Sequence, residues 1–263
     1  MRKKIIVILL TALLFLSAAG LGVATVFRVD VVTLDTSRIT RDSDEEAQAL
    51  LARLKEAYVD ESIFTVKRST AEQIMPEFPY FRITGFTRSY PNRLVIEVAE
   101  DEEVYAVETG NENGKYYILN GKGTVLGVRD DATNRLDGNR NVLLKGLTVS
   151  GEKGSSLLGD EYLNTVFALC GKISEQLNGI RGNVLEIEVL WRVSEGAVIV
   201  LRMQEGVNVY VYNAEDQTNE KAIAAVNAYL ALSVEEKMCG RLQVVDGIDG
   251  KISVAYYDED FSE

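Results

Sequence analysis

The sequence predicts an α+β protein with a single transmembrane helix, a β-α-α-β-β module and a mixed, mainly antiparallel β-domain with two helices. Residues 5–27 form an apolar run without a charged residue, which as a helix would span roughly 34 Å. From residue 28 onward, strand-like and helix-like apolar patterns follow one another. Acidic side chains are concentrated late in the chain, since 28 of the 40 lie within residues 99–263. The predicted segments are a tail 1–4, a transmembrane helix 5–27, domains 28–98 and 99–258, and an acidic tail 259–263.

The charges before the apolar run predict its orientation. Arg2, Lys3 and Lys4 precede it, and basic residues favour the cytoplasmic side of a membrane. We therefore expect a single-pass protein of the cell membrane, with a cytoplasmic N-terminus and the bulk of the chain extracytoplasmic. The alternative is a secretory signal peptide, because small residues offer cleavage positions near Ala19 and Ala24.

Two helix-initiation patterns occur in the first predicted domain. Ser43 and Glu46 have the spacing of a capping box, in which the two side chains bond to each other's backbone N–H groups. Apolar residues then recur every three or four positions, which predicts an amphipathic helix of about four turns. Ser69 and Glu72 repeat the capping-box spacing before a second, shorter helix, which Pro76 ends.

Strand patterns complete the first domain and make up most of the second. Alternating apolar residues from Val29 predict a first strand, and two further strands at 81–89 and 93–98 are joined by a turn at Pro91. In the second domain we expect a hairpin at 116–126, strands at 101–109, 141–149, 184–193, 197–203, 207–212, 241–245 and 252–257, and helices at 159–178 and 219–232.

The composition excludes several classes of chemistry. The chain has no histidine, which removes Ser-His-Asp and Cys-His catalysis and every His-ligated metal. Its net charge of −12 argues against nucleic-acid binding. Cys170 and Cys239 are too far apart for a Cys-x-x-Cys site, and the sequence leaves open whether they pair. We interpret the acidic clusters at 44–46, 101–103 and 130–131 as solvated charge, and we predict no enzyme, cofactor or metal site.

The last predicted strand is the candidate binding element. It consists of Ile252, Ser253, Val254, Ala255, Tyr256 and Tyr257, and acidic residues follow it. If this strand lies at the edge of a sheet, its free N–H and C=O groups can pair with a strand of another protein. An internal strand followed by solubilising acids fits the same pattern, so the sequence leaves both interpretations open.

Four segments, taken in order, carry a resemblance to a known family. They are Phe27-Arg-Val-Asp-Val-Val32, Ser62-Ile-Phe-Thr-Val66, Arg88-Ser-Tyr-Pro-Asn-Arg-Leu-Val-Ile-Glu-Val98 and Tyr117-Ile-Leu-Asn-Gly-Lys-Gly-Thr-Val-Leu126. Their order and spacing resemble the FtsQ/DivIB family of bacterial cell-division proteins, in which a membrane helix is followed by a POTRA domain and a β-domain. The segment 140–146 departs from the family pattern, because it lacks the proline common there.

The resemblance implies a function without catalysis. It implies a membrane-anchored scaffold that links cytoplasmic and extracytoplasmic division proteins, is enriched at the division septum and helps to control septal wall synthesis. Its implied partners are FtsB/DivIC-type and FtsL-type proteins, bound at the final strand of the β-domain, and a septal peptidoglycan synthase. The alternative function is that of a secreted or periplasmic POTRA-type assembly or transport chaperone.

Overall fold

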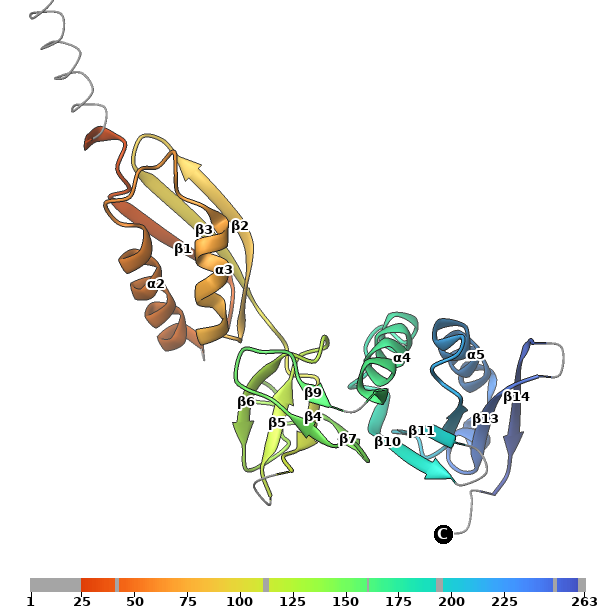
Figure 1. The fold of residues 1–263 in the computed structure, drawn as a ribbon. Helices are drawn as coiled ribbons and strands as arrows, with labels where there is room; N and C mark the ends of the chain where they lie inside the picture. Colours follow the sequence, from red (N-terminus) through yellow and green to blue (C-terminus); the bar gives the residue numbers. More distant parts are fainter. Residues whose placement is uncertain are drawn as a thin grey trace, which may run out of the picture. The chain divides into compact units, whose positions relative to one another are not determined.

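A computed structural model describes residues 25–40, 43–110, 114–159, 161–192, 196–247 and 250–259 of the chain (Figure 1). The chain divides into two compact units, with the boundary between Asp101 and Glu102. The boundary lies beyond residue 98, because the last strand of the N-terminal unit continues to Glu100, which pairs with Phe81.

The N-terminal unit is a three-stranded sheet with two helices on one face (Figure 1). The strand order is β1-β3-β2, in which β1 and β3 are parallel and β2 and β3 antiparallel. Leu50 and Leu54 of the first helix are fully buried against Leu94 and Ile96 of β3, and they form the centre of the core. In chain order the elements are β1 (Val31–Arg38), α2 (Asp44–Tyr58), α3 (Arg68–Ile74), the 3₁₀ turn η2 (Met75–Glu77), β2 (Phe81–Ser89) and β3 (Arg93–Glu100).

The two predicted capping boxes are not formed. The Ser43 side chain makes no capping hydrogen bond at the start of α2, and its hydroxyl donates instead to Glu100 Oε1 at 2.6 Å. The carboxylate of Glu100 also accepts from the backbone N–H and the hydroxyl of Thr40, both at 2.9 Å. Helix α3 begins at Arg68, which places the exposed Ser69 inside the first turn. Tertiary contacts to β3, rather than local capping, therefore fix the start of α2.

The predicted transmembrane helix over residues 5–27 is wrong for the part of the chain that the structure describes. No helix in that part is long and apolar enough to cross a membrane, and residues 1–24 lie outside it. Phe27 belongs to the N-terminal unit: its carbonyl oxygen accepts a hydrogen bond from Ile63 N at 2.9 Å, and its ring centroid lies 5.1 Å from that of Phe64. The single-pass membrane localisation, which depended on this helix, is corrected with it.

The distal unit is built on a nine-stranded mixed sheet of order β14-β13-β12-β11-β10-β7-β4-β5-β6. Adjacent strands are parallel at β12/β13, β10/β7 and β7/β4 and antiparallel elsewhere. The strands are β4 (Tyr105–Glu108), β5 (Tyr116–Leu119), β6 (Val125–Arg129), β7 (Val142–Lys145), β10 (Val184–Arg192), β11 (Gly196–Met203), β12 (Asn208–Tyr212), β13 (Arg241–Asp246) and β14 (Ile252–Tyr257), with β8 (Val149–Ser150) and β9 (Leu158–Gly159) forming a separate pair.

Helices α4 (Tyr162–Gln176) and α5 (Thr218–Ala231) cover one face of this sheet (Figure 1). Val166 and Leu169 of α4 are fully buried and join the same core as Val226 of α5. A short helix α6 (Val234–Lys237), which the sequence analysis did not predict, connects α5 to β13. A capping box is formed at the start of this helix. Ser233 N donates to Glu236 Oε2 at 2.7 Å, and Glu236 N donates to Ser233 Oγ at 3.3 Å.

Two serine substitutions separate tertiary anchoring from local capping. We expect Ser43→Ala to destabilise the N-terminal unit by about 1 kcal/mol, because it removes a hydrogen bond to the Glu100 carboxylate. We expect Ser69→Ala to change the free energy of unfolding by less than about 0.5 kcal/mol, because Ser69 is exposed and caps nothing. Urea unfolding followed by far-UV circular dichroism measures both, and an equal loss in the two variants would contradict this account. In a Glu100→Gln background the effect of Ser43→Ala should become smaller.

Candidate protein-binding strand edge

Strand β14 lies at one end of the nine-stranded sheet. It pairs with β13 from Arg241↔Tyr257 to Asp246↔Ile252 without a register shift. Within the described residues no second strand pairs with it. In such a pair, alternate N–H and C=O groups of a strand point away from its single neighbour. The six residues singled out in the sequence therefore lie on a strand with an open backbone edge.

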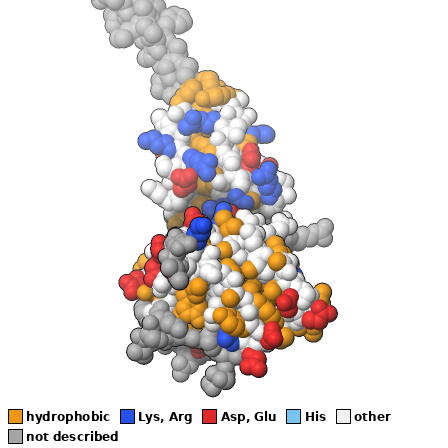
Figure 2. All heavy atoms as spheres, turned by 90° about the vertical axis from the view of Figure 1, so that its right-hand side faces the viewer, with side chains coloured by type: hydrophobic (Ala, Val, Ile, Leu, Met, Phe, Trp, Pro, Cys, Tyr) orange, Lys and Arg blue, Asp and Glu red, His pale blue; other side chains and the backbone are white. Residues whose placement is uncertain are grey.

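The two faces of β14 differ in exposure. Every second residue, beginning with Ile252, is half-buried and packs against the core of the distal unit. Ser253, Ala255 and Tyr257 point to the opposite face and are exposed. Figure 2 is viewed from the side of the distal unit on which β14 lies in Figure 1, and it shows hydrophobic side chains spread over this side with acidic side chains towards its margin. A strand added to β14 would therefore extend one apolar face of the sheet and one solvent-exposed face.

The C-terminal end of β14 is fixed by the first residue of β13 and the two residues before it. The Tyr256 hydroxyl donates to the carbonyl oxygen of Cys239 at 3.4 Å. Gly240 has φ +77°, and a Cβ at this position would lie 2.3 Å from the carbonyl oxygen of Tyr257, so that only glycine fits. The guanidinium group of Arg241 lies over the ring of Tyr257, 4.6 Å from its centroid.

A buried lysine fixes the other end of the β13–β14 hairpin. Lys221 lies on the inward face of α5 and has an exposed fraction of 0%. Its ammonium group donates to the carbonyl oxygens of Tyr212 and Asn213, at 3.0 and 2.7 Å, and forms an ion pair of 2.8 Å with Asp246 Oδ1. The hydrogen bond from Lys221 lowers the pKa of Asp246 below its ordinary value. Helix α5 is thereby joined to the ends of β12 and β13.

Sequence reasoning missed Lys221, although a signal was present. The lysine follows the N-terminus of α5 by one turn and stands beside Ala222 and Ala225, both buried. A charged residue on the same helix face as small buried residues indicates a partner in the protein interior, which here is Asp246 at the end of β13.

Exposed apolar side chains occur on the segment that leads into β13. Leu230 at the end of α5 is 55% exposed, Val234 in α6 is 73% exposed and Met238 is 68% exposed. They follow one another at intervals of four residues. Because the backbone is extended at Leu232, between the two helices, this spacing does not place the three side chains on one helix face, and exposed apolar side chains that stand singly are ordinary on a protein surface.

The acidic clusters do not form a metal site within the part of the chain that the structure describes. Asp44–Glu46 form the first turn of α2, while Glu103 is buried and accepts from Arg129 Nη2 at 2.8 Å. Across the described residues there is no group of three or more side chains suited to hold a metal ion. Cys170 and Cys239 are free thiols, and burial raises the pKa of Cys170 to about 12, so this thiol stays protonated.

No protein-family model matches the chain, and no curated protein matches it. The functional interpretation therefore depends on the geometry of the chain itself and on the resemblance carried by its sequence segments.

The Lys221–Asp246 contact predicts a pH-dependent stability. Because the pKa of Asp246 is lowered on folding, its carboxylate stabilises the fold above about pH 4, and this contribution is lost as the pH falls through the lowered value. We expect Asp246→Asn to destabilise the distal unit by about 1–3 kcal/mol at pH 7. The difference from the wild type should shrink as the pH falls below about 4.

Urea unfolding followed by the fluorescence of Trp191, the single tryptophan, measures this difference in the distal unit. Asp258→Asn is the matched control, because Asp258 is an exposed aspartate beside the same hairpin. A difference between wild type and Asp246→Asn that does not decrease as the pH is lowered below about 4, over the range in which both variants still fold, would contradict the ionic role of Asp246.

Proposed function

We propose that this chain is a non-enzymatic scaffold protein that binds a segment of a partner protein as an added strand on β14. The observation that carries the proposal is that β14, a strand of six residues, ends the nine-stranded sheet with no further strand paired to it among the residues that the structure describes. Edges that are not used are usually protected by a bulge, a proline or a charge on the strand. The β13–β14 register is unbroken, and β14 contains only Ile, Ser, Val, Ala and Tyr.

The chemistry of the edge suggests which segment it binds. Main-chain hydrogen bonds to an added strand contribute about 0.5–1.5 kcal/mol each, and side chains on alternate positions supply specificity. The apolar face, beginning at Ile252, favours a partner strand with apolar residues at every second position. Asp258 and Glu259 follow β14 directly, so basic residues beside the partner strand would accelerate association.

The resemblance to the FtsQ/DivIB family supports a role for this binding mode in bacterial cell division. Under this proposal the partners are FtsB/DivIC-type and FtsL-type proteins, with a septal peptidoglycan synthase as a further contact, and the scaffold helps to control septal wall synthesis. The POTRA-like arrangement of the N-terminal unit, with order β1-β3-β2 and both helices on one face, supports the assignment. The proposal does not depend on a membrane anchor.

A second candidate function is that of a POTRA-type assembly or transport chaperone. It is favoured by β2, a nine-residue strand at the edge of the N-terminal sheet. Such a chaperone would bind unfolded client segments at β2, so substitutions in β14 would leave client binding unchanged. The two functions therefore differ in which edge the partner needs.

Proline substitutions in β14 test the proposal. Neighbouring residues of a strand direct their N–H groups to opposite sides, so one of Val254→Pro and Ala255→Pro removes an outward N–H and the other breaks a bond to β13. We expect the outward variant to remain folded and to bind a purified FtsB/DivIC-type partner at least about tenfold more weakly, as measured by calorimetry.

The matched control is Ala255→Val, which keeps the backbone N–H and should bind within about threefold of the wild type. Fluorescence of Trp191 and circular dichroism report whether each variant is folded. Unchanged partner binding by a folded outward-proline variant would remove β14 as the binding edge.

A further inference from the structure

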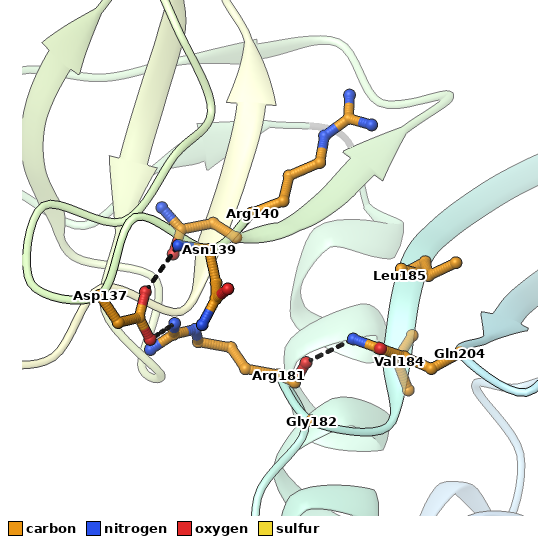
Figure 3. A pocket seen from close by; sticks show the side chains of 9 residues that line it. Asp137, Asn139, Arg140, Arg181, Gly182, Val184, Leu185 and Gln204 are labelled. Carbon is orange, nitrogen blue, oxygen red and sulfur yellow. Dashed lines mark hydrogen bonds and ion pairs between the residues drawn. The ribbon is translucent and has the colours of Figure 1, made fainter.

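A hollow of about 600 Å³ in the distal unit lies between the loop that precedes β7 and the start of β10 (Figure 3). Arg181 forms an ion pair there with Asp137, whose carboxylate also accepts from Asn139 N at 2.9 Å. Gln204 on the other wall donates to the carbonyl oxygen of Arg181 at 3.0 Å. Donors and acceptors are thus mixed in this hollow, and it selects no class of ligand. The edge of β14 differs, because no described strand pairs with its outer side.

The hydrogen bonds of the β13–β14 hairpin show which residues of β14 direct their backbone groups outward. Gly247 N donates to the carbonyl oxygen of Lys251 at 2.6 Å. These two residues stand one step beyond the pair Asp246↔Ile252. Hydrogen-bonded and non-hydrogen-bonded pairs alternate along an antiparallel ladder, so every second residue of β14 turns its N–H and C=O groups away from β13. Counted from Lys251, this outward set consists of Ile252, Val254 and Tyr256.

The pairing of β13 with β12 gives the same assignment independently. Asn208 N donates to the carbonyl oxygen of Gly240 at 3.1 Å, so this carbonyl group points towards β12. The N–H of Arg241 belongs to the same trans peptide group and therefore points in the opposite direction, towards β14. Arg241 is paired there with Tyr257, which is accordingly one of the residues that turn towards β13.

The outward residues are arranged symmetrically about Val254. A second copy of β14, turned by 180° about an axis beside Val254, would pair Val254 with Val254 and Ile252 with Tyr256. Each of these pairs can exchange two N–H···O=C hydrogen bonds, because both members direct their backbone groups outward. The described strand contains no proline, no charged residue and no bulge, which are the usual features that prevent such pairing.

The charges that flank β14 favour this antiparallel arrangement. Lys251 precedes the strand, Asp258 and Glu259 follow it, and all three are exposed. Pairing centred on Val254 places Lys251 opposite Tyr257 of the second copy and so beside the acidic residues that follow it. Opposite charges would therefore meet at both ends of the paired strands, whereas an in-register parallel arrangement would bring like charges together.

We propose that β14 also binds β14 of a second copy of this chain, and that this second copy and the partner strand compete for the same edge. The competition rests on the proposed function, whereas the pairing between copies rests on the edge geometry and the flanking charges. Association ends at a dimer, because each copy uses its β14 edge once. At the other end of the sheet a loop covers the first part of β6, where Val125 N donates to Ser155 O at 2.8 Å.

The dimer is weak for two physical reasons. A contact of six residues per copy is small against the roughly 1,200 Å² that stable interfaces bury. The net charge of −12 also makes two copies repel each other. The chain is therefore a monomer with an open edge in dilute solution, and it pairs where its local concentration is high.

Sedimentation equilibrium of the full chain, at concentrations from about 5 to 500 µM, tests the pairing. We expect a dimer at the upper end of this range. Lys251→Glu and Asp258→Lys should each weaken self-association at least about threefold, because like charges then meet across the axis. An equimolar mixture of the two variants should associate as the wild type does, because every contact then joins opposite charges. Association through residues 1–24, which both variants retain, would not respond in this way.

Val254→Pro removes the outward N–H at the axis and should abolish the dimer, while Ala255→Val keeps every backbone N–H and should retain it. Absence of a dimer at about 500 µM, equal association in wild type and both charge variants, or no recovery on mixing them would overturn the proposal. A purified FtsB/DivIC-type partner should dissociate the dimer, and a complex that holds both would contradict the competition. Partner binding by the chain at about 5 µM, where it is a monomer, tests the proposed function separately.

Discussion

Lys221 carries its ammonium group into the interior of the distal unit, where its exposed fraction is zero. A buried cation without partners costs several kcal/mol, so Lys221 can occupy this place only when oxygen atoms surround it. The carbonyl oxygens of Tyr212 and Asn213 and the carboxylate of Asp246 supply them, and they come from the ends of β12 and β13. Helix α5 and these strands therefore pack in one fixed arrangement, which also positions β14, whose one partner among the described strands is β13.

The two edge strands of the nine-stranded sheet differ in how far other residues cover their backbone. At β6, Val125 N donates to Ser155 O and its carbonyl oxygen accepts from Gly154 N, both at 2.8 Å, so a loop covers the first part of that edge. At β14 the described residues provide no such cover, while Lys221 and Gly240 fix the hairpin at its two ends. An edge that is already ordered costs less conformational entropy when a partner strand binds, which suits β14 to recognition.

Sequence patterns predicted helices and strands where apolar periodicity was strong. They failed where contacts between distant residues determine the structure. The stripe of α4 and the pair β2–β3 follow from periodicity alone. Ser43 has a capping-box spacing but bonds to Glu100, because a tertiary partner competes with the local one. Phe27 is the last residue of the apolar run, yet it packs on the N-terminal core. The hydropathy pattern therefore placed the start of the N-terminal unit too late in the sequence. The sheet order leaves β14 at one end because β13 has β12 as its other neighbour, and this parallel pairing of strands that are distant in sequence does not follow from apolar periodicity.

Amide hydrogen exchange on the full chain, alone and with an FtsB/DivIC-type partner, tests the central claim most directly. In the free chain the N–H groups of β14 that point away from β13 should exchange quickly, while those bonded to β13 are protected. The account predicts that the partner slows the outward set by at least about tenfold and leaves the β2 edge unchanged. Protection that appears elsewhere while the outward amides of β14 continue to exchange at the free rate would contradict it.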